Sequence, residues 1–415
     1  MPLLHRLCTL GTVTMLAALT GCGQGEPLGP IDELPRPLSA GETRLIEASN
    51  EFALNIFNAL SPQHPDSNLF ISPLSVSMAL GMTYNGAEGN TRAEMATALA
   101  LDGMSLDEVN QSYRSLIDLL LGLDTRVEMN VANSIWARAG VSFEQAFLDV
   151  NRQYFDARIE ALDFSSASAA KTINDWVSDA TRGRIPSIVP EQIPPDAVMY
   201  LINAIYFKGK WTQQFAKAET RERPFELRSG SVIQVPTMAH NAAHDFGLFT
   251  DDDVQIVDLP YGGGAFSMTV VVPRSGVTLS DLVGTLDEAT WHRWIDGLTD
   301  VGVIVELPKF TIQYENKLND ALKALGMIEA FAETADFSRM RAARDVYITT
   351  VQHKAFVKVD EEGTEAAAAT SVEIGVVCAC GPPVVQIDRP FLFAIRERFS
   401  GTILFMGRVV DPTQQ

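Results

Sequence analysis

Cysteine is nearly absent from this chain of 415 residues, which contains only four. Cys8 and Cys22 lie in an N-terminal segment with the features of an export signal, and Cys378 and Cys380 are separated by a single residue. A disulfide over so short an interval would be strained, so no crosslink between distant parts of the chain is expected. In an oxidising compartment the folded body must therefore be stabilised by its hydrophobic core.

Positive charge is also scarce in this sequence. Lys and Arg together number 32 against 52 Asp and Glu, which gives a formal net charge of -20 and a pI near 4.7. Nucleic-acid binding needs a basic surface that displaces counterions from phosphates, so this class of partner is excluded. No run of five or more acidic residues occurs, and we expect the acidic groups to be spread over a solvated surface.

Catalytic motifs are missing as well. The chain has six histidines and no HExxH motif. His240 and His244 have the spacing of metal ligands on a helix, but they lie beside strand-like residues without an obvious third ligand, so we predict a surface loop there. The glycines at 262–264 lack the Lys-Ser/Thr of a phosphate-binding loop and indicate a hairpin turn. No GxSxG nucleophile elbow occurs, and two thiolates in "CAC" make a poor closed metal site. We therefore predict no enzyme activity and no cofactor.

Residues 1–21 have the organisation of a signal peptide. The sequence "MPLLHRLCTLGTVTMLAALTGC" has a short basic start, an apolar stretch from Leu7 to Leu19 that is too short to span a bilayer comfortably, and small residues at its end. Its last four residues, 19–22, resemble a bacterial lipobox, which would make Cys22 the lipidated first residue of the mature protein. Acyl chains on Cys22 would hold the protein on a membrane surface. The alternative is an ordinary secretory signal that happens to contain a cysteine.

The segment after Cys22 differs in composition from the rest of the chain. Residues 22–40 are rich in Pro and Gly with few large apolar side chains, which is typical of a flexible tether. Residues 41–415 are predicted to form one domain. The protein is therefore expected to be exported, and either anchored at the cell envelope or surface by lipid or secreted.

Helical patterns precede strand patterns along the body. Helices are predicted over residues 45–60, 74–81, 91–99, 169–181, 279–298 and 316–325. Strands are predicted over residues 127–138, 197–211, 233–240, 254–261, 266–273, 301–310, 355–362, 391–397 and 403–410. Helices first and strands later predict an α+β domain rather than alternating βαβ units.

One segment, "DEEGTEAAAATSVEIGVVCACGPPVV" at 360–385, carries conflicting propensities. Its four consecutive alanines behind glutamates favour a solvated helical turn, whereas the Thr, Ser, Val and Ile that follow favour a strand. In an extended strand, alternation would separate two sets of side chains onto opposite faces. One face would carry Thr364, Ala366, Ala368, Thr370, Val372 and Ile374, and the other Glu365, Ala367, Ala369, Ser371, Glu373 and Gly375. Both glutamates then share one face and both bulky apolar residues share the other, as in a half-buried strand.

The stretch "EEGTEAAAAT" at 361–370 closely resembles the proximal hinge of the reactive-centre loop in serpins, a family of serine protease inhibitors. Further stretches resemble other serpin motifs in the same order, over about residues 40–412. These are "NLFISPLSVSMAL", "LINAIYFKGKW", "ELPKFTI" and "RPFLFAIRERFSGTILFMGRVVDP". A single motif of this kind is weak, but five in order with matching spacing are specific.

The resemblance implies a serpin fold, with helices packed around a large, mostly antiparallel central sheet, smaller sheets and an exposed reactive-centre loop at about 361–385. It also implies a monomeric suicide inhibitor. A target serine protease attacks the loop and forms a covalent acyl complex, and the cleaved loop then inserts into the central sheet before the enzyme can deacylate. Gly363 is a flexible pivot for this movement.

The resemblance also locates the bait bond. Counted from Gly363, the scissile bond lies between Val377 and Cys378, although loop-length variation leaves any position from Val376 to Cys380 open. A small aliphatic Val377 suits elastase-like proteases and argues against trypsin-like ones, which need Arg or Lys. The thiols of Cys378 and Cys380 make the loop sensitive to oxidation, or are neutral variation in a variable segment.

Two further groups of residues match serpin positions that control sheet opening. Ser72, Ser75, Asn203 and His353 match the shutter, a hydrogen-bonded cluster beneath the parting strands. Trp211, Lys309 and Glu361 match the breach, where the loop first enters the sheet and a Glu-Lys pair is expected. The simpler interpretations are a satisfied core histidine for His353 and a solvated charge for Lys309.

Three hypotheses from different classes follow. The first is an inhibitor of elastase-like serine proteases, with cysteine proteases as alternative targets. The second is a non-inhibitory protein of the same fold that binds a ligand or partner. The third, a hydrolase or metalloenzyme, is supported only by His240 and His244, and the small side chains of the hinge favour the first.

Overall fold

A computed structural model describes residues 29–364 and 382–414 of the chain. The compact unit that contains the body spans Ile31–Gln415. The backbone N–H of Ile31 donates to the Gly263 carbonyl at 2.8 Å, and Leu34 and Leu38 pack on the core. From Ile31 onward the segment predicted as tether is therefore part of the body.

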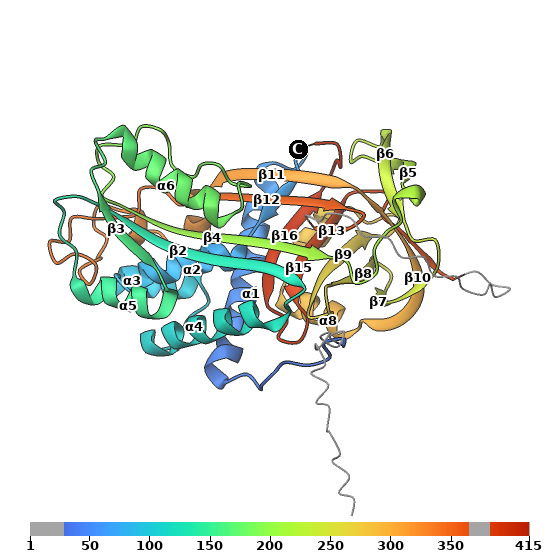
Figure 1. Cartoon of the computed structure of the whole chain (residues 1–415), viewed down its shortest axis with the longest axis horizontal. Helices are drawn as coiled ribbons and strands as arrows, with labels where there is room; N and C mark the ends of the chain where they lie inside the picture. Colours follow the sequence, from blue (N-terminus) through green and yellow to red (C-terminus); the bar gives the residue numbers. More distant parts are fainter. Residues whose placement is uncertain (1–28, 365–381, 415) are drawn as a thin grey trace, which may run out of the picture. The chain divides into compact units, whose positions relative to one another are not determined.

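Most of the helices come from the first half of the described chain (Figure 1). The structure has α1 (Ala40–Leu60), α2 (Pro73–Tyr84), α3 (Gly89–Ala98), α4 (Leu106–Leu123), α5 (Gln145–Phe155), α6 (Ala167–Ala180), α7 (Leu279–Gly284), α8 (Glu288–Asp296) and α9 (Asn319–Ala324). Side-chain caps define several starts, such as the capping box between Ser39 and Glu42 on α1. At α2, Ser72 is the N-cap and Pro73 takes the first helical position.

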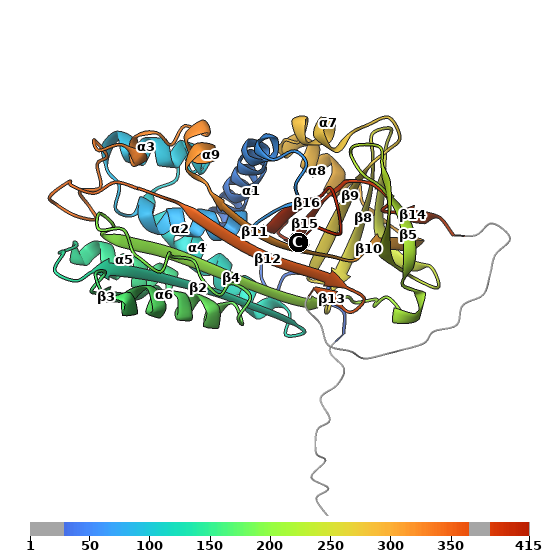
Figure 2. The same cartoon turned by 90° about the horizontal axis from the view of Figure 1, so that it is seen from above.

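A six-stranded sheet runs in the order β11-β12-β13-β4-β2-β3. Its strands are β11 (Phe310–Lys317), β12 (Gln352–Asp360), β13 (Gly363–Thr364), β4 (Met199–Lys210), β2 (Val127–Arg138) and β3 (Arg158–Leu162). All pairs are antiparallel except β2 with β3. Figure 2 shows α6 on the opposite side of β2 and β4 from α1 and α2. Both faces of β4 are thus covered, as its apolar sequence predicted.

A ten-stranded sheet carries the order β1-β16-β15-β9-β8-β7-β10-β6-β5, with β14 paired to β10. Its strands are β1 (Leu69–Ile71), β5 (Arg221–Glu226), β6 (Val232–Ala239), β7 (His244–Thr250), β8 (Val254–Tyr261), β9 (Phe266–Pro273), β10 (Thr299–Pro308), β14 (Val384–Gln386), β15 (Phe391–Glu397) and β16 (Ile403–Val409). The two flanks of the undescribed segment 365–381 therefore belong to different sheets, because β13 lies in the six-stranded sheet and β14 in this one.

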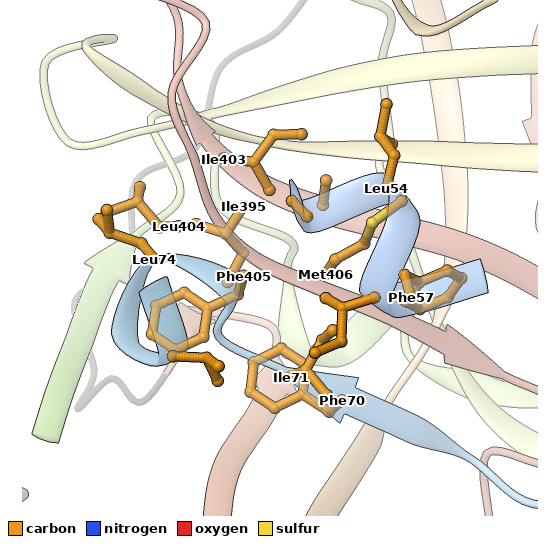
Figure 3. Close-up of a cluster of buried hydrophobic side chains, with 14 of the residues drawn as sticks. Leu54, Phe57, Phe70, Ile71, Leu74, Ile395, Ile403, Leu404, Phe405 and Met406 are labelled. Atoms are coloured by element: carbon orange, nitrogen blue, oxygen red, sulfur yellow. The ribbon is translucent and has the colours of Figure 1, made fainter. Parts of the chain in front are cut away.

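The main core lies between α1, α2 and the strands β1, β15 and β16 (Figure 3). Phe70 of β1 stacks on Phe393 and Phe405, with ring centroids 5.7 and 5.3 Å apart. Every residue of β15 and β16 is buried. This apolar stack ties the C-terminal strands to the N-terminal helices, so the ends of the body fold as one unit.

The α+β class is confirmed, and three element predictions are corrected. Residues 279–298 form two helices, α7 and α8, rather than one. Residues 301–310 are not one strand, because the chain passes at Lys309 from β10 in one sheet to β11 in the other. The helix predicted over 316–325 starts late, since Asn316 and Lys317 still pair with β12. Helices α4 and α5 were also not predicted from the sequence.

No helix of the described residues is long and apolar enough to cross a membrane.

Candidate functional site

A narrow slot divides the six-stranded sheet between β4 and β12. At its upper end Gly363 and Thr364 lie between the two strands, pairing with Asp360 and Val359 on one side and with Lys210 and Gly209 on the other. Below this point no described strand bridges β4 and β12. A cavity of about 1110 Å³ lies at the lower end, lined by residues of both strands. The slot has the two unpaired edges that an additional antiparallel strand requires.

Gly363 is sterically required at the top of this slot. Its φ is +147°, and a Cβ at this position would lie 2.1 Å from the Gly209 carbonyl oxygen. No larger residue fits there without moving the β4 backbone. The predicted pivot therefore lies where the chain packs directly against the β4 backbone and leaves no room for a side chain.

Thr364 is already buried in the sheet, with 3% of its surface exposed. Its hydroxyl lies 2.8 Å from the Tyr261 hydroxyl, and Tyr261 stacks on Trp211 with ring centroids 4.5 Å apart. Burial raises the pKa of Tyr261 well above its ordinary value. Tyr261 thus stays protonated and fixes Thr364 on the inner face of the sheet.

The predicted breach residues lie together just before this point. The Lys309 ammonium lies 2.8 and 2.9 Å from the two carboxylate oxygens of Glu361, and the Thr220 hydroxyl donates to Glu361 at 2.8 Å. Burial alone would raise the pKa of Glu361, but the hydrogen bonds, chiefly that from Lys309, lower it. Only 6% of the Glu361 side chain is exposed, so its charge depends on this pairing.

Trp211 fastens the end of β4 to the same segment. Its indole N–H donates to the Asp360 carbonyl at 2.9 Å, and its backbone N–H donates to the Glu362 carbonyl at 2.9 Å. Lys217 forms an ion pair of 2.5 Å with Glu362. Two of the predicted breach residues, Trp211 and Lys309, therefore hold the stretch 360–362 from different parts of the chain, and the third, Glu361, belongs to that stretch.

The four predicted shutter residues also come together, beneath the slot. The Ser72 backbone N–H donates to His353 Nε2 at 3.1 Å, and the Ser72 hydroxyl donates to the Leu404 carbonyl at 2.8 Å. Ser75 donates its hydroxyl to the Asn203 carbonyl at 3.3 Å. The N-terminal turn of α2 thus contacts β12 through His353 and β4 through Asn203.

His353 is held in its neutral form. It is buried, and burial lowers its pKa from 6.5 to about 4. Its Nε2 accepts the Ser72 N–H, which a protonated imidazole could not do. The interpretation as a satisfied core histidine is therefore correct, and it is compatible with a place in the shutter.

Other predicted positions have separate outcomes. His240 is buried at the end of β6 rather than on a surface loop, stacked on Phe215 at 3.9 Å and near His244, with ring centroids 4.9 Å apart. Among the described residues no cluster of three or more His, Cys, Asp or Glu could hold a metal ion. The glycines at 262–264 form the turn between β8 and β9, as predicted. Cys22, Glu365–Thr370, Val377 and Cys378 lie outside the described residues.

Two contacts of the site were not found from the sequence. Tyr261 meets the hinge through Thr364, and Asn133 of β2 accepts a 2.7 Å hydrogen bond from the Asn203 side chain. Both contacts join residues of different strands, so they depend on strand register. The strand pattern around Tyr261 was visible, but it does not identify the residue opposite.

Comparisons with known proteins agree on one family. A family model described as serpin (serine protease inhibitor) matches residues 47–412. Neuroserpin of Gallus gallus is 34% identical over 394 residues, covering 93% of this chain and 96% of that protein. The human leukocyte elastase inhibitor is 35% identical over 380 residues, covering 89% and 100%. The crystal structure of a thermophilic serpin, tengpin, in the native state matches with a TM-score of 0.79 and 30% identity, covering 92% of this chain and 97% of that one.

Proposed function

The chain belongs to the serpin family, and we propose that it is a suicide inhibitor of elastase-like serine proteases. The observation that carries this proposal is the position of Gly363 and Thr364 between β12 and β4. The hinge already occupies the first positions of an additional strand, and below it no strand of the described residues pairs with the facing edges of β4 and β12. An inhibitor that inserts its cleaved loop needs this arrangement.

The register of the first pairs supports insertion of the remaining hinge. Continued along both edges, it would bring Thr370 opposite Asn203 on β4 and opposite His353 on β12. Because Thr364 faces the core, the alternate residues Ala366, Ala368 and Thr370 would face the shutter. Their small side chains suit a strand that must enter a packed sheet quickly.

The chemistry follows from the proposed bait bond. The protease serine Oγ attacks the carbonyl carbon of Val377, and the bond to the nitrogen of Cys378 breaks. That nitrogen takes up a proton and leaves as a new amino terminus, while Val377 remains esterified to the serine. Insertion of the freed hinge before water attacks the ester would trap the covalent acyl complex. The inhibitor would be consumed and would have no turnover of its own.

Val377 supports an elastase-like target, since a small aliphatic side chain fits a shallow specificity pocket. A similar protein, the human leukocyte elastase inhibitor, carries that activity in its name. We further propose that Cys22 is lipidated and anchors a monomeric inhibitor at the cell envelope or surface. Incorporation of labelled palmitate, lost in Cys22→Ala, tests the anchor separately from inhibition.

The test of inhibition is incubation of the purified chain with elastase. An inhibitor gives a covalent complex that survives SDS and boiling, and mass spectrometry of the released C-terminal fragment locates the scissile bond. Cleavage with no complex and no rise in Tm would instead favour the non-inhibitory binding protein. A complex formed only with papain-like enzymes would favour cysteine proteases as targets.

A further inference from the structure

Two lysines flank the slot directly below the inserted hinge. Thr364 pairs with Gly209 of β4 and Val359 of β12, so Lys208 and Lys358 are the next residues down on the two sides. Their side chains lie on the outer face of the sheet, because Gly209 and Val359 lie in register with the inward-facing Thr364 and side chains alternate along each strand. Both lysines therefore border the position that the residue after Thr364 would take.

A third cation lies on the same face. Arg184, in the segment that follows α6, places its guanidinium carbon 5.1 Å from the ring centroid of Phe356. Phe356 is two residues from Lys358 on β12 and shares its face. β4, β12 and the α6 connection thus each contribute one positive group around the upper slot.

Neighbouring acids of the described residues only partly neutralise the two lysines. Lys358 forms an ion pair of 3.1 Å with Asp360. Glu128 of β2 is opposite Lys208 in register, but its carboxylate pairs with Arg182 at 3.0 Å. Lys208 makes no ion pair with any described residue. In a chain of net charge -20, the upper slot is a local site of positive charge that favours an incoming carboxylate.

We propose that Lys208, Lys358 and Arg184 are positioning residues that receive the Glu365 carboxylate as the loop inserts. Glu365 lies outside the described residues, but it directly follows Thr364. Because the Thr364 side chain faces Tyr261, an extended continuation turns the next side chain to the outer face, toward the three cations. This inference rests on the proposed insertion mechanism and names the charges that would favour its first step.

The same lysines would also disfavour closure of the empty slot. Across one intervening strand, β4 and β12 are about 10 Å apart, two strand spacings. If they paired directly, Lys208 and Lys358 would become like-charged cross-strand neighbours, which destabilises a sheet. Insertion of Glu365 would replace this repulsion with two attractive contacts. The cations would therefore favour both an open slot and a filled one.

The test compares charge variants in the full chain by three measurements: the stoichiometry of inhibition of elastase, the rate of loop cleavage, and the Tm after cleavage. We expect K208E and K358E each to raise the stoichiometry at least about threefold, with an unchanged rate of loop cleavage. E365K should do the same, and the charge swap of E365K with K208E and K358E should restore most of the inhibition. Such rescue distinguishes a charge contact from a folding defect.

The matched control is K354Q, on the same strand and face as Lys358 and paired with Glu315 at 2.9 Å. In the same register, Lys354 would lie opposite Ala369, which carries no charge. K354Q should therefore leave the stoichiometry of inhibition unchanged. Wild-type behaviour of K208E and K358E, or a charge swap without rescue, overturns this inference while leaving inhibition intact. If the wild type forms no complex, the proposed function fails, and the Tm of the cleaved chain then tests this inference by itself. A rise in Tm on cleavage that is smaller in K208E supports the contact between the lysines and Glu365. No rise in Tm on cleavage overturns it.

Discussion

The hydroxyl groups of Tyr261 and Thr364 lie 2.8 Å apart at the top of the slot between β4 and β12. The contact identifies the face of β13 that points inward, which is set by the pairing of β13 with β4 and β12. Since Thr364 faces the core, every second residue after it would also face the core. This register would place the bulky apolar residues of the hinge, rather than its glutamates, in the interior.

Thr364→Arg should convert the inhibitor into a substrate. An arginine at this position would bury an unpaired charge beside Tyr261 in the inserted state. This would destabilise the inserted state by roughly several kcal/mol. Elastase should still cleave the loop, but insertion would be slower than deacylation. We expect the stoichiometry of inhibition to rise more than about tenfold, which corresponds to about 1.4 kcal/mol between the two competing steps. Gel densitometry of complex against cleaved product measures this ratio.

Thr364→Ser is the matched control, because it keeps the hydroxyl that meets Tyr261 and adds no bulk. It should inhibit like the wild type. Equal inhibition by Thr364→Arg would show that residue 364 need not be buried in the inserted state.

Val377→Arg should redirect the inhibitor from elastase to trypsin. A trypsin-like pocket needs a basic side chain, whereas a shallow elastase pocket accepts a small aliphatic one. Second-order rate constants with both enzymes measure the change, and we expect a rise for trypsin with a fall for elastase. If Val376→Arg or Ala379→Arg produces this exchange instead, the bait bond lies at that position.

Lys309→Gln should destabilise the protein by about 2 kcal/mol, since it leaves the buried Glu361 carboxylate without its cation. Chemical denaturation gives the free energy of unfolding. The double variant Lys309→Gln with Glu361→Gln should recover much of the loss, because it removes the unpaired charge as well. A loss no larger than that of the exposed pair Lys171 and Asp175 would contradict a structural role for the breach pair.

Much of this site was accessible from the sequence because its signals are local. The alternation after Thr364 put one face in the interior, and the observed burial of Thr364 agrees. The α+β class followed from the order of the patterns. For α4 the signal was also present, since leucines at 116, 119, 120 and 123 repeat at helical spacing and are all buried.

The remaining contacts depend on long-range register, which no local pattern contains. Lys208 and Lys358 become neighbours of one position only because β13 pairs with both β4 and β12. His240 illustrates the same limit. Its strand-like neighbours and the lack of a third ligand led to the prediction of a surface loop, but the ring stacks on Phe215 from a distant segment and is buried.

Acid should weaken the shutter through His353. Its folded pKa of about 4 lies below the ordinary 6.5, so the unfolded chain binds more protons between these two values. Stability is therefore complete above pH 6.5 and falls as the pH drops toward 4, by about 3 kcal/mol for a shift of this size. Protonation would also replace the acceptor of the Ser72 N–H with a donor. His353→Gln keeps an acceptor but cannot titrate, so its free energy of unfolding should depend less on pH over this range than that of the wild type. Equal slopes for His353→Gln and the wild type would contradict a buried, neutral His353.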